Sequence, residues 1–152
     1  MQVKIYRYDP DQDEKPRMQE FDVDGKNSKM LLDLLIHIKD YIDPSLSFRR
    51  SCRQGVCGSD GMNVNGKNVL ACITPLNDLS NKIEVRPLSG MPVVKDLVVD
   101  MDNFFNNYKE TTPWLQADSQ AIPSKEFLQS PKEREKIDGL YECILCLSLI
   151  HI

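Results

Sequence analysis

Three cysteines and one aspartate, spaced C-x4-C-x2-D-x11-C, constrain this chain more than any other feature of its sequence. Their positions are Cys52, Cys57, Asp60 and Cys72, and the first part of the run reads "SCRQGVCGSDG". Thiolates are soft ligands that bind zinc, Cu(I) or iron–sulfur clusters in preference to hard cations. The region is therefore a candidate metal centre built mainly on sulfur.

The spacing helps to choose among these metals. Structural zinc sites usually leave about two residues between paired ligands, whereas C-x4-C-x2-C is the run found in plant-type [2Fe–2S] proteins. Gly55, Gly58 and Gly61 allow the backbone to approach closely and to adopt positive φ. Their N–H groups can point at the sulfur charge and raise the reduction potential. The three cysteines are therefore predicted to hold a [2Fe–2S] cluster.

Asp60 stands where the plant-type run has its third thiol. A carboxylate is a harder ligand than a thiolate but still binds iron, so we expect Asp60 to be the fourth ligand. The alternative is a solvated turn aspartate in "GSDG". Arg49, Arg50 and Arg53 flank the loop, where they would offset the cluster's charge, lie free on the surface or contact a partner protein.

Composition limits the classes of function that remain. The chain has 152 residues and a net charge of -4, so it spans one domain or little more, and a nucleic-acid partner is not indicated. No run of apolar residues is long enough for a transmembrane segment, and the N-terminus lacks the form of a signal peptide. The thiols are thus expected to be reduced, and five cysteines favour metal or redox chemistry over disulfides.

The order of the predicted elements indicates an α+β fold of the β-grasp type, as in plant-type [2Fe–2S] ferredoxins. Residues 28–42 have helical periodicity with Ser28 as a candidate N-cap, and Asp43-Pro44 ends the helix. Asn65-Gly66 is a strong type I′ turn signal. The predicted strands cover residues 3–8, 17–23, 46–50, the two arms of a hairpin over 61–72, and 82–87.

The second part of the chain has a different character. One predicted helical face, read as a core stripe, carries Val94, Val98, Met101, Phe105 and Tyr108. A later helix should begin at an N-cap serine followed by an N1 proline and a capping-box glutamate, in the run "SPKE", and continue towards a glycine at position 139. The predicted boundary lies near residue 100, with a β-grasp domain over 1–99 before it; on the resemblance described below, residues 100–146 are an incomplete α-helical ferredoxin-like domain.

A second cysteine pair, Cys143 and Cys146, forms a C-x2-C motif. It would be a redox dithiol, half of a zinc knuckle, or the start of the bacterial ferredoxin run C-x2-C-x2-C-x3-C-P. That run demands cysteines at positions 149 and 153, but the chain has Leu149 and its last residue is Ile152. Two thiols do not close a four-iron cluster, so this pair is at most a partial [4Fe–4S] site.

The stretch "DPSLSFRRSCRQGVCGSDGMNVNGKNVLACITPL" resembles the iron–sulfur subunit of succinate dehydrogenase, within the succinate:quinone oxidoreductase and fumarate reductase family. "YRYDPD", "RPLSGMPVVKDLVVDM" and "DGLYECILC" match the same family in the same order, so the resemblance extends to about residue 146. Some bacterial members of this family have aspartate at the position of Asp60.

The resemblance implies an electron-transfer subunit with no substrate-activating acid or base. In this family the [2Fe–2S] cluster lies near an FAD-containing flavoprotein subunit that oxidises succinate in the tricarboxylic acid cycle. Electrons then continue through a [4Fe–4S] and a [3Fe–4S] cluster to quinone, beside cytochrome b-type membrane-anchor subunits of the respiratory chain. The implied location is peripheral, on the cytoplasmic face of the bacterial inner membrane.

The last six residues, 147–152, read "LSLIHI" and depart from the family pattern. We expect a truncated reading frame with a non-native tail; a deliberately shortened protein is the alternative. The chain as written is then expected to assemble only the first cluster and not to deliver electrons to quinone.

Three other functions compete with this interpretation. The fumarate reductase iron–sulfur subunit uses similar parts in the opposite direction. A zinc-stabilised β-grasp interaction module would use the same cysteines, although the four-residue gap weighs against it. A stand-alone soluble ferredoxin is disfavoured by the helical second half.

Overall fold

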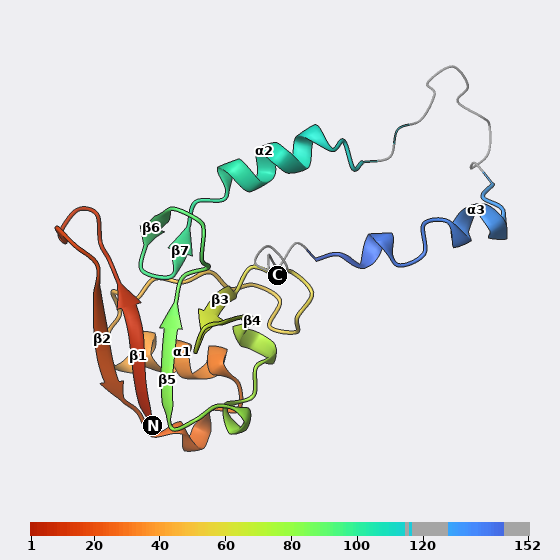
Figure 1. Cartoon of the computed structure of the whole chain (residues 1–152). Coiled ribbons are helices and arrows are strands. Elements are labelled where there is room, and N and C mark those ends of the chain that lie inside the picture. Colours follow the sequence, from red (N-terminus) through yellow and green to blue (C-terminus); the bar gives the residue numbers. More distant parts are fainter. Residues whose placement is uncertain (115, 117–127, 145–152) are drawn as a thin grey trace. The chain divides into compact units, whose positions relative to one another are not determined.

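The computed structural model describes residues 1–114, 116 and 128–144. Among them, one compact unit contains Met1–Asp100 and a second contains Met101–Cys143. Figure 1 shows the sheet of the first unit with one helix, α1, behind it. The predicted cluster region lies in this first unit.

The first unit is built on a five-stranded mixed sheet with the order β2-β1-β5-β3-β4. The central pair, β1 and β5, is parallel, and the other neighbours are antiparallel. This arrangement, with a single long helix on one face, confirms the predicted α+β fold of the β-grasp type. The strands are β1 (Gln2–Arg7), β2 (Arg17–Asp22), β3 (Gly61–Val64), β4 (Lys67–Leu70) and β5 (Lys82–Arg86).

Helix α1 (Leu31–Tyr41) contributes five residues to the buried core, because its apolar residues recur at helical spacing. The side chains of Leu34, Leu35 and Ile38 are fully buried against inward residues of the sheet such as Ile5. The helix ends before Asp43-Pro44, as the sequence predicts. Two short turns of 3-10 helix lie in the connections: η1 (Gly25–Asn27) between β2 and α1, and η3 (Leu76–Asp78) between β4 and β5.

The predicted N-cap of α1 is wrong. Ser28 closes the C-terminal end of η1, where its N–H donates to the Gly25 carbonyl. Met30 occupies the N-cap instead, and its N–H donates to the Asp33 carboxylate at 3.0 Å. The Asp33 side chain thus makes the reciprocal half of a capping box, while Asp33 N–H donates to the Met30 carbonyl at 3.1 Å.

The hairpin of β3 and β4 follows the prediction closely. Asn65 and Gly66 have φ values of 50° and 87°, the two positive angles that a type I′ turn requires. This turn fixes the register, so that Gly61 lies opposite Leu70 and Val64 opposite Lys67.

The predicted strand over 46–50 does not form. Leu46 is fully buried, but the Ser47 N–H donates to the Asp96 carboxylate at 2.8 Å and the Ser47 carbonyl accepts from Leu97 N–H at 3.2 Å. Because these groups bond to a loop instead of a neighbouring strand, the segment is extended chain outside the sheet.

The predicted helical stripe from Val94 to Tyr108 is also wrong in its first half. Residues 93–99 form a small hairpin of β6 (Val93–Lys95) and β7 (Val98–Val99), and Asp96 turns it with φ at 48°. Helix α2 (Asp102–Glu110) begins only afterwards and buries none of its residues. Phe105 and Tyr108 are therefore exposed and form no core stripe in the described part of the chain.

The later helix begins as predicted but is shorter. The Ser130 hydroxyl accepts from Glu133 N–H, and the Glu133 carboxylate accepts from Ser130 N–H, which completes a capping box. Helix α3 spans Pro131–Glu135. A turn follows it and reaches Gly139, whose φ is 81°. A single 3-10 turn, η4 (Leu140–Glu142), precedes Cys143. Within the described ranges, no helix is both long and apolar enough to cross a membrane.

A buried ion-pair network fastens the start of the sheet to distant loops. The Arg7 guanidinium donates from Nε to Asp96 at 2.9 Å and from Nη1 to Asp43. Both Arg7 and Asp96 are almost fully buried, at 4% and 1% exposure. Burial alone would raise the pKa of Asp43, but hydrogen bonds from Ser45 and Arg7 outweigh it and lower the pKa to about 2.

The depressed pKa of Asp43 predicts an acid-sensitive contribution to stability. The contribution is present above the ordinary pKa of 3.8 and is lost as the pH falls towards about 2. Asp43→Asn should lower the free energy of unfolding at neutral pH by about 1–2 kcal/mol and flatten its decline over that acid range. Urea unfolding followed by circular dichroism measures both.

Asp22→Asn is the matched control, since this carboxylate is 90% exposed in β2. It should leave the unfolding free energy and its pH dependence unchanged. Equal acid sensitivity in the wild-type chain and Asp43→Asn would contradict the assignment.

Candidate iron–sulfur site

The β3–β4 hairpin brings Asp60 and Cys72 together. Asp60 immediately precedes β3, and Cys72 lies in η2 (Ala71–Ile73), immediately after β4. The register continues past the strands, because Ala71 N–H donates to the Asp60 carbonyl at 3.2 Å. The Asp60 carboxylate then accepts from Cys72 N–H at 2.5 Å. The eleven residues between Asp60 and Cys72 are thus the length of one tight hairpin.

The loop from Cys52 to Cys57 wraps its backbone around sulfur. The Cys52 Sγ accepts N–H groups from Gln54 at 3.4 Å and from Val56 and Cys57 at 3.3 Å each. Cys52 N–H in turn faces the Cys57 Sγ at 3.5 Å. Such a concentration of amide dipoles stabilises negative charge on the sulfurs.

Cys72 belongs to the same cradle although it comes from the hairpin. Gly55 N–H donates to the Cys72 Sγ at 3.3 Å, and the next amide, Val56 N–H, donates to the Cys52 Sγ. Two adjacent amides therefore serve two thiols from different parts of the chain. Gly55 reaches this position with φ at 73°, and a neighbouring turn depends on positive φ at Arg53 (61°).

The thiols differ in their ionisation. A hydrogen bond with the Ser59 hydroxyl, at 3.1 Å, followed by the backbone N–H of Cys52, lowers the pKa of Cys57 to about 6. Burial and then the Asp60 carboxylate raise the pKa of Cys72 to about 11. Because a metal binds thiolate, occupation of the site would release the Cys72 proton, while Cys57 is largely ionised at neutral pH.

The chemistry of the donor set is compatible with a two-iron cluster. A [2Fe–2S] cluster takes its four protein ligands as two pairs on two irons, so it does not need them to converge on one point. Three sulfurs in an amide cradle, with a carboxylate beside the most buried of them, suit that requirement.

The other residues that the sequence singled out lie in different surroundings. Asp60 is 3% exposed, so it is not the solvated turn residue of the alternative reading. Gly55 donates its N–H to sulfur as expected, but Gly61 N–H donates to the Gly58 carbonyl instead. Arg49 is engaged with the Val99 carbonyl at 2.8 Å, while Arg50 and Arg53 are exposed. Cys143 is exposed and belongs to the second unit, and Cys146 lies outside the described residues.

Sequence reasoning missed three contributors. Ser59 sits two residues after Cys57, and a small hydroxyl at that spacing in a glycine-rich loop was the available signal. The amides of Gln54 and Val56 carry no side-chain signature at all, because any residue except proline supplies them.

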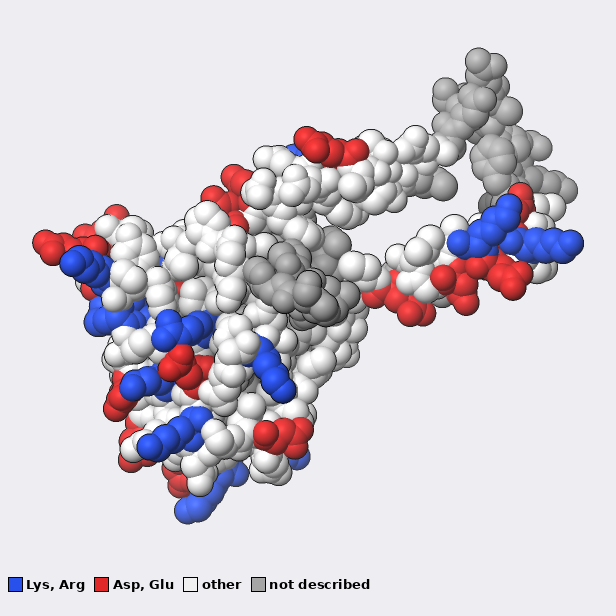
Figure 2. Space-filling model, in the orientation of Figure 1, with Lys and Arg blue, Asp and Glu red and all other residues white. Residues whose placement is uncertain are grey.

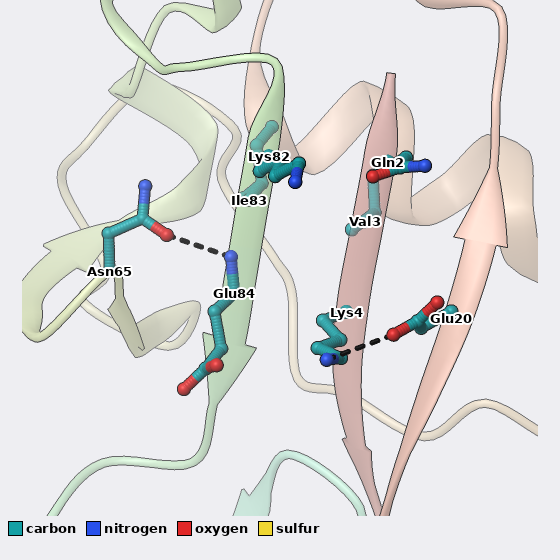
Figure 3. Close-up of a pocket in the computed structure, with 8 residues that line it drawn as sticks. All are labelled: Gln2, Val3, Lys4, Glu20, Asn65, Lys82, Ile83 and Glu84. Atoms are coloured by element: carbon teal, nitrogen blue, oxygen red, sulfur yellow. Dashed lines mark hydrogen bonds and ion pairs between the residues drawn. The ribbon is translucent and has the colours of Figure 1, made fainter.

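A separate hollow lies on the face of the sheet that points away from α1 (Figure 3). Several of its polar groups pair with one another: Lys4 with Glu20 at 2.9 Å, and Glu84 N–H with the Asn65 side chain at 2.8 Å. Basic and acidic side chains are interspersed over the visible face of the sheet unit, with no patch of one sign (Figure 2).

A β-grasp sheet with three thiols around an amide-lined loop is the arrangement expected of an iron–sulfur carrier of the ferredoxin type. The model of one protein family, described as the 2Fe-2S iron-sulfur cluster binding domain, matches residues 2–106. The chain belongs to this family.

Similar proteins agree with this membership. The succinate dehydrogenase iron-sulfur subunit of Coxiella burnetii (strain RSA 493 / Nine Mile phase I) is 53% identical over 148 residues, which are 96% of this chain and 62% of that protein. The mitochondrial succinate dehydrogenase [ubiquinone] iron-sulfur subunit 1 of Oryza sativa subsp. japonica is 50% identical over 145 residues, 93% of this chain and 52% of its own. The chain thus spans between half and two thirds of these relatives.

A solved structure supports the fold. It is described as the Mycobacterium smegmatis Sdh1 complex in the apo form, and one of its chains matches with a TM-score of 0.83 at 22% identity. The match covers 99% of this chain and 62% of that one.

Gly55 offers a test of the cradle. A Cβ at this position would meet Ile73 side-chain atoms at 3.1 and 3.2 Å, and the residue has positive φ. Gly55→Ala should therefore displace the amide from Cys72 and lower cluster content on reconstitution by about tenfold. Iron and acid-labile sulfide per chain measure the effect.

Gly66→Ala is the matched control, since it has φ at 87° but nothing within 4 Å of its added Cβ. It should lower stability by about 1 kcal/mol and leave cluster content unchanged. Adding Ile73→Ala to Gly55→Ala removes the contact and should restore part of the cluster. Equal cluster content in both glycine variants would contradict the role of Gly55.

Proposed function

We propose that this chain is the electron-transfer iron–sulfur subunit of a succinate dehydrogenase, passing electrons from a flavoprotein subunit towards quinone. The observation that carries the proposal is the cradle in which adjacent amides of one loop serve Cys52 and Cys72. The names of the relatives at 50–53% identity supply the complex in which such a carrier works. When bound, the cluster supplies a one-electron carrier.

The proposed ligands are Cys52, Cys57, Asp60 and Cys72. Cys57 is exposed and its pKa is lowered to about 6, so it would offer a thiolate to the cluster at neutral pH. Cys72 and Asp60 lie on the buried side, where the protein excludes water from the cluster. The amides of the loop hold the negative charge of the four anionic ligands and so tune the reduction potential.

The remaining parts of the assignment rest on the relatives' longer chains. The β-grasp domain would cover residues 1–99, and residues 100–146 would begin an α-helical ferredoxin-like domain in which Cys143 and Cys146 are partial [4Fe–4S] ligands. A [3Fe–4S] cluster, membrane-anchor subunits and the quinone side would complete the whole protein. Its location would be peripheral, on the cytoplasmic face of a bacterial inner membrane.

Anaerobic reconstitution with iron and sulfide tests the cofactor. The chain should turn brown, bind two irons and two sulfides, and give an S = 1/2 electron paramagnetic resonance signal when reduced. Cys52→Ser and Cys72→Ser should lose or alter this signal, whereas Cys143→Ser should keep it. Colourless protein that carries only zinc would instead support the zinc-stabilised module.

The flavoprotein subunit of the Coxiella relative tests the place of the chain in electron transfer. Mixed with that subunit and succinate, the reconstituted chain should be reduced, with bleaching of its visible absorption. Fumarate in place of succinate is the control and should leave the chain oxidised. A chain that a chemical reductant reduces, but that the flavoprotein with succinate does not, would overturn the proposed partner.

A further inference from the structure

The segment that leads into Cys52 is held by the β6–β7 hairpin. Leu46 is fully buried, and the Lys39 ammonium donates to its carbonyl at 2.6 Å, so the segment is anchored to the core up to this residue. Beyond it, Ser47 N–H donates to the Asp96 Oδ2 at 2.8 Å, and the Ser47 carbonyl accepts from Leu97 N–H. Closer to the cysteine loop, Arg49 Nη1 donates to the Val99 carbonyl of the β6–β7 hairpin at 2.8 Å.

Asp96 is itself fixed by the first strand. Its Oδ1 accepts from Arg7 Nε at 2.9 Å and from Tyr8 N–H at 3.0 Å, while its own N–H donates to the Tyr8 carbonyl at 2.8 Å. The side chain is 1% exposed. One carboxylate therefore joins β1 to the segment before Cys52, with one oxygen for each.

Arg7 also binds the residues just before this segment, Asp43 and Ser45. Its Nη2 donates to the Ser45 hydroxyl at 2.7 Å, and its Nη1 donates to both Asp43 and the Gln19 side chain. The planar guanidinium thus fixes Asp43, Ser45 and Asp96 relative to one another.

The two groups of cluster ligands reach the site by different routes. Cys72 and Asp60 are placed by the β3–β4 hairpin, whereas the loop from Cys52 to Cys57 follows the fastened segment. The adjacent Gly55 and Val56 amides serve one sulfur from each group. A shift of residues 46–51 would therefore move the thiols of Cys52 and Cys57 relative to Cys72, while the β3–β4 hairpin stayed in place.

We propose that Arg7 and Asp96 are positioning residues for the [2Fe–2S] centre, which hold the loop of Cys52 and Cys57 at the distance from Cys72 that the cluster requires. This inference rests on the proposed function. It gives a buried ion pair in β1 and the β6–β7 hairpin a role in cluster retention separate from its share in global stability.

The test compares variants of the reconstituted chain. Asp96→Asn keeps the size of the side chain but weakens its hold on Arg7 and Ser47. The control is Ile83→Ala in β5, a core residue at 1% exposure whose apolar side chain has no hydrogen-bonding group. At temperatures equally far below each variant's unfolding midpoint, Asp96→Asn should lose its cluster to a chelator about tenfold faster than Ile83→Ala.

Two further measurements keep the inference open to refutation. Ser45→Ala removes two contacts of one exposed hydroxyl, that with Arg7 Nη2 and that with the Asp43 carboxylate. Compared equally far below its own unfolding midpoint, it should still accelerate cluster loss by about two- to threefold. In Asp96→Asn, hydrogen exchange should accelerate at the amides of residues 47–57 and stay unchanged in β3 and β4. The reduced electron paramagnetic resonance signal should broaden in the same variant.

The outcomes separate the two claims. If Asp96→Asn and Ser45→Ala lose their clusters no faster than Ile83→Ala, Arg7 and Asp96 only stabilise the fold, and the proposed function stands without the inference. If the wild-type chain takes up no [2Fe–2S] cluster, the proposed function fails, and the inference falls with it.

Discussion

The site depends on the register of one antiparallel hairpin. Because β3 and β4 pair around Asn65 and Gly66, the residue before the first strand and the residue after the second must meet. That geometry turns a sequence separation of twelve residues into a hydrogen bond between Cys72 N–H and the Asp60 carboxylate. A slip of one residue would send the Cys72 side chain to the other face of the sheet.

The two halves of the candidate site differ in their surroundings. The loop half is exposed and lined with amide donors, which favour thiolate, whereas the hairpin half is buried beside a carboxylate, which favours thiol. Iron must therefore compete with a proton mainly at Cys72. The Gly55 amide, which donates to this sulfur, offsets that competition.

Local chemistry made much of this structure predictable from the sequence. The Asn-Gly turn, the serine–glutamate capping box and the helical spacing of α1 are each determined by neighbouring residues, and all three were confirmed. The β-grasp order followed because hairpin, helix and closing strand leave few ways to pair. The cysteines and Asp60 were selected by spacing, and the structure brings Asp60 and the three thiols into one region, although their ligation of iron stays a prediction.

The errors fall where distant partners decide. Residues 46–50 look like a strand, but Asp96, nearly fifty residues later, takes the Ser47 amide out of reach of the sheet. The apolar spacing from Val94 to Tyr108 suggests one helix, but the positive φ of Asp96 breaks it into a hairpin and a later helix. Neither the Arg7–Asp96 pair nor its consequences leave a pattern in the local sequence, because the two residues are 89 positions apart.

That separation has a consequence for the order of events during synthesis. The parallel partner of the first strand ends at Arg86, and the carboxylate that fastens the cysteine loop comes ten residues after it. All three of the proposed thiol ligands of the first cluster leave the ribosome before β5 and Asp96 do. A nascent chain therefore carries three cysteines for a time before the elements that enclose them have been made.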